Sequence, residues 1–481
     1  DAALRAGRVR AEAQCGATHV PDDVARDTPV ALDECVDEEH GDTYACKNAQ
    51  LLCRRTFAQL GGSASGSGND IWGWTGDSGD EYALVGLSHG TALVRVTSAQ
   101  RGDVCEPLAW VPTATVASTW RDIKVFKHYA LIVSEARGHG MQIVNLNHLE
   151  GMEASADGAA PLTVPKCAAP QDGDQQLCWA HDTTTGNCHN VFVHESAQTA
   201  YAVGCTARPA SCQGSMVYSL ADNPLTPQHL LCFTSARYTH DIECVDYAGP
   251  DTRFHGKRLC FAYDAGYQFT VFDATDPAAP VELSSSTYAD LAYCHQGWLS
   301  PDHTYAMMND ELGPPGRAYV CDVSDITQPN CDHYYEQREL GMSSQHNEYF
   351  LGEQVYQANY QAGVGVFSGM PTEFKLDAVF DSARGYDRDR PGFNGVWSSY
   401  VDYANNKVVL SDIQRGLFVV RFELPSFQLQ MAQRALRSCG GADDDDMHVD
   451  IRVVANSRAR ANAHGFRKVR LAAAGAAVHA G

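Results

Sequence analysis

The sequence predicts an all-β fold: a seven-bladed β-propeller with a small cysteine-rich N-terminal extension and a C-terminal tail. Seven segments of similar sequence recur at intervals of 48 to 68 residues. Each contains three or four short runs rich in β-branched and aromatic residues, which favour strands over helices. Repeats of this length and content are typical of propeller blades, because one blade buries its faces only by stacking on its neighbours.

Each repeat begins with a polar pair followed by alternating apolar residues, as expected for the innermost strand of a blade. The seven starts are NDIWGW, RDIKVF, HNVFVH, HDIECV, HQGWLS, HNEYFL and NGVWSS, beginning at Asn69, Arg121, His189, His240, His295, His346 and Asn394. A second run follows each start and a third comes after a turn, as in YALVGL and TALVRV of the first repeat. Several repeats continue through a proline turn into a fourth strand.

The last repeat, from Asn394 to about Pro425, lacks a fourth run. The segment NAQLLC, which begins at Asn48, precedes the first repeat and looks like a single outer strand. We predict that it completes the seventh blade and closes the ring, although it could instead belong to a separate N-terminal domain. The expected organisation is therefore an extension over residues 1–45, the propeller over 46–425, and a tail or attachment segment over 426–481.

Cysteine content and charge indicate the compartment and narrow the range of partners. The chain has 17 cysteines and no CxxC pair, which favours a disulfide framework formed in an oxidising compartment. The net charge of −23 argues against a nucleic-acid partner. No apolar run is long enough to span a bilayer. We therefore expect a secreted, extracellular or cell-surface protein.

Four disulfides are predicted. Cys244 and Cys260 face each other across the first two strands of blade four, and Cys321 and Cys331 lie on strands three and four of blade five. The other two pairs close loops, Cys205 with Cys212 and Cys167 with Cys178. The four N-terminal cysteines are Cys15, Cys35, Cys46 and Cys53. Three ways of pairing them are possible, and the sequence does not decide among them. No partner is predicted for Cys105, Cys188, Cys232, Cys294 and Cys439.

The motifs of the repeats also resemble a known family. NDIWGW, STWRDIKV, YTHDxxC, HQGW, HNxY, YQANYxAGxxV, FNGxWS and SDIxRGLFV occur in order between about Cys46 and Pro425. Together they are similar to the choice-of-anchor B family, whose members carry LVIVD-type propeller repeats and are secreted or surface-attached. The resemblance implies a fold and a compartment, and it implies no biochemical activity.

The first strand of each blade lines the centre of a propeller, so equivalent positions form a ring. The candidate ligand residues at these positions are Arg121, Asp122, His189, His240, Asp241, His295, His346, Asn347 and Asn394. Because side chains alternate along a strand, we expect one member of each starting pair to point straight inward. The second strands end at the same rim, where the expected carboxylates are Glu135, Asp264, Asp310 and Asp412.

Two interpretations of the histidine row remain open. His189, His240, His295 and His346 could bind a transition metal, with carboxylates as supporting hydrogen-bond partners. The same residues could instead tie neighbouring blades together by hydrogen bonds. Calcium on the rim carboxylates is a further alternative, and the cofactor stays unknown.

The favoured function is binding of an extracellular protein or glycan at the histidine-bearing end of the ring, with no catalytic residue predicted. One alternative is a metal-dependent enzyme in which Arg121 binds an anionic substrate. Another is a structural subunit of an extracellular homo- or hetero-assembly joined through its termini.

Overall fold

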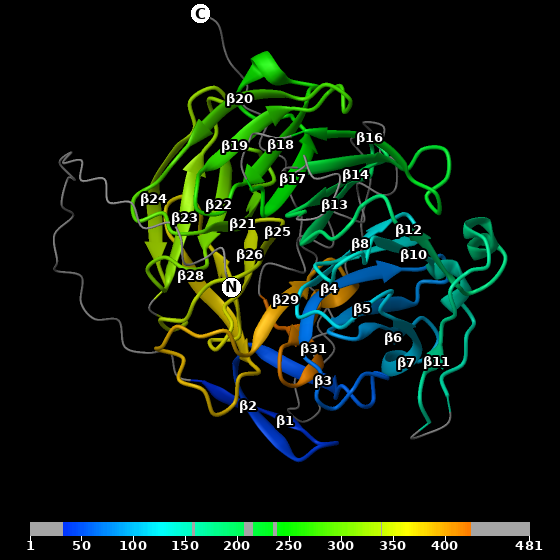
Figure 1. The fold of residues 1–481 in the computed structure, drawn as a ribbon. Coiled ribbons are helices and arrows are strands. Elements are labelled where there is room, and N and C mark those ends of the chain that lie inside the picture. Colours follow the sequence, from blue (N-terminus) through cyan, green and yellow to red (C-terminus); the bar gives the residue numbers. More distant parts are fainter. Residues whose placement is uncertain (1–31, 156–158, 206–214, 234–237, 338, 425–481) are drawn as a thin grey trace, which may run out of the picture. The chain divides into compact units, whose positions relative to one another are not determined.

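The computed structural model describes residues 32–155, 159–205, 215–233, 238–337 and 339–424. The strands of this part form seven sheets, and the first strand of each blade lies nearest their common centre (Figure 1). The predicted all-β, seven-bladed propeller is therefore confirmed. In the described part of the chain, no helix has both the length and the apolar character needed to cross a bilayer.

Blades one to three are built from consecutive antiparallel strands, apart from one insertion. Blade one contains β4 (Gly68–Thr75), β5 (Glu81–Leu87), β6 (Gly90–Ser98) and β7 (Gly102–Pro112). Blade two contains β8 (Arg121–Phe126), β9 (Tyr129–Ser134), β10 (Met141–Asn145) and β12 (Trp179–Asp182). Blade three contains β13 (Asn190–His194), β14 (Thr199–Val203), β15 (Ser215–Ser219) and β16 (Gln228–Phe233).

The insertion between β10 and β12 explains the longest spacing between repeats. It carries two 3₁₀ helices, Leu146–Leu149 and Pro170–Asp174, and the short strand β11 (Leu162–Thr163). β11 runs parallel to β7 and so adds a fifth strand to blade one. The insertion therefore connects the outer edges of blades one and two.

Blades four to seven follow the same plan. Blade four contains β17 (Asp241–Asp246), β18 (Arg258–Tyr263), β19 (Phe269–Asp273) and β20 (Val281–Ser286), with a 3₁₀ turn at Thr252–Phe254. Blade five contains β21 (Cys294–Leu299), β22 (Tyr305–Asp310), β23 (Arg317–Asp322) and β24 (Asn330–Glu336). Blade six contains β25 (Glu348–Leu351), β26 (Gln354–Ala358), β27 (Val364–Ser368) and β28 (Lys375–Asp381). Blade seven contains β29 (Val396–Tyr400), β30 (Lys407–Asp412), β31 (Gly416–Phe422) and, from the N-terminal side, β3, with a 3₁₀ turn at Ala404–Asn406.

The ring closes by strand pairing, as predicted. β3 (Ala49–Arg55) pairs antiparallel with β31, with Ala49 opposite Phe422 and Arg55 opposite Leu417. The hairpin of β1 (Asp33–Asp37) and β2 (Asp42–Lys47) does not stand apart from the blades. β2 pairs with β28 and extends the sheet of blade six to six strands.

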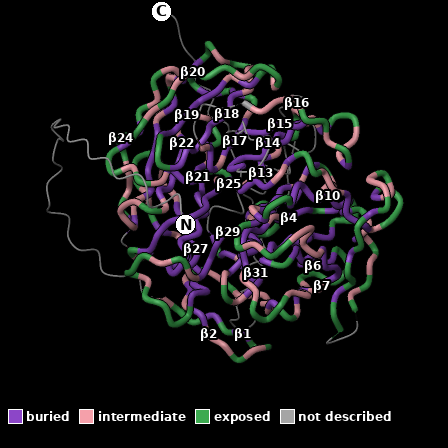
Figure 2. Tube along the Cα trace, viewed as in Figure 1, coloured by how far each residue is buried: buried purple, intermediate pink, exposed green. Residues whose placement is uncertain are grey.

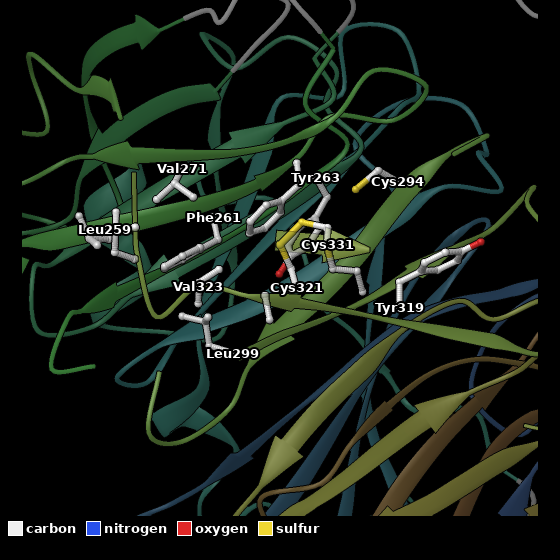
Figure 3. Close-up of a cluster of buried hydrophobic side chains, with 14 of the residues drawn as sticks. Leu259, Phe261, Tyr263, Val271, Cys294, Leu299, Tyr319, Cys321, Val323 and Cys331 are labelled. Carbon is white, nitrogen blue, oxygen red and sulfur yellow. A yellow bond between two sulfur atoms is a disulfide. The ribbon is translucent and has the colours of Figure 1, made fainter. Parts of the chain in front are cut away.

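The core lies between neighbouring blades, where apolar side chains of facing sheets are buried and the connecting turns are exposed (Figure 2). Between blades four and five, Leu259 and Phe261 of β18 pack in one cluster with Leu299 and Val323 of blade five (Figure 3). This packing explains why a single blade would not be stable alone.

Three of the four predicted disulfides are present: Cys167–Cys178, Cys244–Cys260 and Cys321–Cys331. The predicted pairing of Cys205 with Cys212 is wrong, because Cys205 is bonded to Cys188. These two cysteines flank the antiparallel pair of β13 and β14, whose register brings their Cα atoms within 3.9 Å. Cys212 lies outside the described residues.

The N-terminal cysteines do not pair only among themselves. Cys35 is bonded to Cys46 within the β1–β2 hairpin, whereas Cys53 of β3 is bonded to Cys105 of β7. Cys15 and Cys439 lie outside the described residues. Among the cysteines that the structure describes, the free thiol is Cys294, which is buried and lies apart from the Cys321–Cys331 bond in Figure 3.

Candidate functional site

Four histidines stand side by side at the end of the ring where the inner strands begin. The ring centroids of His189 and His240 are 4.3 Å apart, those of His240 and His295 4.2 Å, and those of His295 and His346 4.4 Å. All four side chains are buried. Blades three to six thus supply a continuous arc of imidazoles, and we call this end of the ring the histidine end.

Irregular strand pairing lets three of the four histidines face their neighbours. The backbone N–H of His189 donates to the carbonyl of Val203, although Val203 stands opposite Asn190. In the same way the N–H of His240 donates to the carbonyl of Tyr263, which stands opposite Asp241. His295 lies at a register shift in the pairing of β21 with β22. Two successive residues therefore face one partner, as in a β-bulge, and such bulges re-aim side chains. Simple alternation, used in the prediction, does not hold at these positions.

The Nδ1 atoms of the histidines are held by acceptors. His240 Nδ1 lies 2.8 Å from the carbonyl oxygen of His295, and His346 Nδ1 lies 2.6 Å from that of Trp397. His295 Nδ1 lies 3.1 Å from Asn309 Oδ1. Because a carbonyl oxygen only accepts hydrogen bonds, Nδ1 carries the hydrogen and the neutral ring keeps its lone pair on Nε2. The same imidazoles can therefore tie blades through Nδ1 and bind through Nε2.

His189 has a different partner. Its Nδ1 lies 2.6 Å from Glu135 Oε1, which follows the second strand of blade two. Burial lowers the pKa of His189, but the hydrogen bond and charge of Glu135 outweigh it and the pKa is raised. His189 and Glu135 therefore form a charge-assisted pair at the edge of the arc.

The other three histidines are held neutral. Burial lowers the pKa values of His240, His295 and His346 well below the usual value, and neighbouring imidazoles of the arc lower them further. Neutral imidazole is the form that binds transition metals.

Glu311 stands between two of these rings. Its carboxylate oxygens lie 3.9 Å from His295 Nε2 and 3.9 Å from His346 Nε2. Tyr360 donates a hydrogen bond of 2.5 Å to Glu311 Oε1. Burial raises the pKa of Glu311. Among the described residues, three donor atoms of histidine and carboxylate side chains lie within 4.8 Å of one another and could hold a metal ion. They belong to His295, Glu311 and His346.

Aromatic side chains surround this end. Trp120, whose carbonyl accepts a hydrogen bond from the N–H of Glu135, is 45% exposed. Phe393, whose ring lies 5.3 Å from that of Tyr360, is 53% exposed. Tyr293 packs against His240 with ring centroids 5.2 Å apart. Solvent-facing aromatic surface thus borders the buried imidazoles.

Deeper along the inner strands, aromatic rings meet across the centre of the ring. Trp72 of blade one lies 5.8 Å from Tyr349 of blade six, and Tyr349 lies 5.1 Å from Trp298 of blade five. Trp298 lies 6.1 Å from Phe192 of blade three. Blades one and six, like blades three and five, are separated by another blade, so these contacts reach beyond neighbouring blades.

Most residues that follow the starting positions join neighbouring blades. Asp122 Oδ2 accepts a hydrogen bond of 2.6 Å from the N–H of Val191, and Gln296 exchanges hydrogen bonds with the backbone of Glu348. Asp241 is bonded to the N–H of its own successor, and its pKa is raised to about 7 by burial and by Asp122. These contacts belong to the blade packing.

The other candidate residues have protein partners of their own. Arg121 is 1% exposed and donates to Leu87, Thr113 and His139 between blades one and two. Asn394 exchanges hydrogen bonds with the side chains of Gln361 and Gln414. Asn347 accepts a backbone hydrogen bond from Ala358. None of these contacts joins the histidine arc.

Of the expected rim carboxylates, Glu135 contacts a histidine. Asp264 is buried and accepts hydrogen bonds from Thr239 and Thr270. Asp310 is buried and accepts hydrogen bonds from Tyr288 and from the N–H groups of residues 292 and 293. Asp412 is likewise buried, with Ser382, Gln414 and Arg415 as donors. These three aspartates order turns.

Sequence reasoning placed Asp310 at this rim and did not single out Glu311, Tyr360 or Tyr293. Glu311 directly follows β22, as Glu135 directly follows β9. The position just after the second strand of a blade could therefore have identified Glu311 as a residue of this rim. Tyr360 holds a comparable place two residues after β26. No protein-family model and no curated protein matches the chain.

Proposed function

We propose that this protein is an extracellular binding propeller that takes a glycan at the histidine end. The observation that supports this is the meeting of exposed aromatic surface, at Trp120 and Phe393, with the carboxylates of Glu135 and Glu311. Aromatic faces pack against the apolar C–H faces of a sugar, and carboxylates accept hydrogen bonds from its hydroxyls.

An oxidising compartment fits the cysteine chemistry. Six disulfides join described cysteines, and bonds of this kind persist in secreted and cell-surface proteins. The resemblance of the repeats to the choice-of-anchor B family supports the same compartment. Membership in that family and secretion are both part of the proposal.

Binding to an oligosaccharide array tests the proposal. We expect the wild-type protein to bind at least one saccharide, and we expect Trp120→Ala and Glu135→Gln to weaken that binding at least about tenfold. Glu353→Gln is the matched control, because Glu353 is exposed in the β25–β26 turn at the opposite end of the inner strands. Equal binding by Glu135→Gln and Glu353→Gln, or no saccharide binding by wild type, would contradict it.

A metal-dependent enzyme is the second candidate. It is favoured by the donor group of His295, Glu311 and His346. The version in which Arg121 binds an anionic substrate has little support, since that guanidinium is buried and its hydrogen bonds go to protein groups.

A further inference from the structure

We infer that His295, His346 and Glu311 form a binding site for a divalent transition-metal ion. The inference that an ion binds depends on these three residues alone. Any role of the ion in binding a sugar depends on the proposed function. Two histidines and one carboxylate are a ligand set that leaves coordination positions open.

The distances suit a site that tightens slightly around an ion. The two carboxylate–imidazole separations are 3.9 Å, and all three donor atoms lie within 4.8 Å of one another. Ligand atoms bound tetrahedrally at 2.1 Å from an ion stand about 3.4 Å apart. The two separations to Glu311 must close by about 0.5 Å, and no pair of the three donor atoms has to close by more than about 1.4 Å.

The surrounding contacts hold the ligands in the orientation that metal binding needs. Nδ1 of His295 is occupied by Asn309 and Nδ1 of His346 by the carbonyl of Trp397, so both Nε2 lone pairs are directed to the Glu311 side. The hydroxyl of Tyr360 fixes one oxygen of Glu311. Such hydrogen bonds to the far atoms of the ligands orient and strengthen metal sites.

At 3.9 Å, neither imidazole nitrogen is hydrogen-bonded to Glu311, since such bonds require about 3.2 Å or less. Two lone pairs and a carboxylate therefore face one another as acceptors. A bound cation satisfies all three at once.

The chemistry of the donors selects the ion. Imidazole nitrogen with one carboxylate suits zinc, iron or manganese, whereas calcium prefers six to eight oxygen ligands. His189 and His240 lie outside the group of donor atoms, and His189 is paired with Glu135. The inferred site therefore uses two of the four histidines of the arc, and His240 is the next imidazole beside His295.

Metal titration of the full chain tests the inference. After dialysis against EDTA, we expect one Co²⁺ ion to bind per chain, with visible absorption bands of nitrogen-ligated cobalt, and we expect Zn²⁺ to displace it. Glu311→Gln keeps an acceptor for Tyr360 but removes the charge, and His346→Gln removes one imidazole. Each variant should bind Co²⁺ at least about tenfold more weakly, while Glu353→Gln should match wild type.

Absence of the cobalt bands in folded wild-type protein would overturn the inference, and this holds even if a variant fails to fold. Loss of binding in Glu135→Gln equal to that in Glu311→Gln would also overturn it, because the ion would then belong to the His189 side. If EDTA-treated protein binds saccharide but does not bind added Co²⁺, the metal site is refuted and the glycan proposal is not. Cobalt binding without any saccharide binding refutes the glycan proposal alone.

Discussion

At the scale of single residues, a buried cation without a carboxylate partner defines the contact between blades one and two. Burial lowers the pKa of Arg121 to about 10. One guanidinium nitrogen lies 3.1 Å from Nε2 of His139, whose Nδ1 lies 2.9 Å from the carbonyl of Gly140. Neutral His139 therefore accepts a hydrogen bond from Arg121, and a protonated ring would place two cations in contact.

This contact predicts a specific sensitivity to acid. Burial and the charges of Arg121 and His181 lower the pKa of His139 from 6.5 to about 3. Below pH 6.5 His139 is protonated in the unfolded chain but stays neutral in the folded protein. The free energy of unfolding therefore falls as the pH falls. The expected loss from this residue between pH 7 and pH 5 is about 2 kcal/mol.

Urea unfolding at the two pH values measures the effect. In His139→Gln, which keeps a neutral acceptor beside Arg121, the difference in unfolding free energy between pH 7 and pH 5 should shrink by about 2 kcal/mol. An unchanged difference would show that His139 is not the residue responsible.

At the scale of elements, the closing strand is fixed twice. β3 is hydrogen-bonded to β31, and its Cys53 is bonded to Cys105 on β7 of the next blade. That disulfide spans 52 residues of sequence, whereas Cys35–Cys46 spans 11. A cross-link over a longer loop removes more entropy from the unfolded chain.

Replacing both cysteines of each pair with serine tests this difference. From loop length, the loss of unfolding free energy should be about 4 kcal/mol for Cys53→Ser with Cys105→Ser, and about 3 kcal/mol for Cys35→Ser with Cys46→Ser. Denaturant unfolding of the two double variants gives the comparison. A larger loss in the Cys35 and Cys46 variant would contradict the argument.

At the scale of the whole propeller, closure depends on β3 and not on the hairpin before it. A chain that begins at Thr56 leaves the edge of β31 unpaired, and exposed edges of this kind promote aggregation. A chain that begins at Asn48 loses β1 and β2 but keeps β3, so it exposes only β28, the outer strand of a complete four-stranded blade.

We expect the Asn48 chain to remain monomeric with a wild-type circular dichroism spectrum, and the Thr56 chain to aggregate. Both chains carry Cys105→Ser so that the missing bond to Cys53 is matched, and light scattering reports the aggregates. A monomeric, folded Thr56 chain would show that the ring closes without its strand pair.

The sequence was sufficient to predict the blades and their closure, because strand runs repeat and the last repeat lacked one run. It was not sufficient to predict the Cys188–Cys205 bond, since Cys212 is nearer to Cys205 in the chain but register decides which cysteines meet. The bulges at the histidines likewise depend on strand pairing. Trp72 and Trp298 contact aromatic rings of blades that are not their neighbours, a relation that only the assembled ring creates.

Those aromatic contacts have a consequence for what the protein can recognise. Trp72, Tyr349, Trp298 and Phe192 place aromatic rings in the centre below the histidines and so narrow it. If a glycan binds as proposed, these rings favour its approach to the imidazoles from the histidine end. For a polysaccharide, this geometry favours reading the terminal sugar over the interior ones, and the number of binding positions would then scale with chain ends and not with chain length.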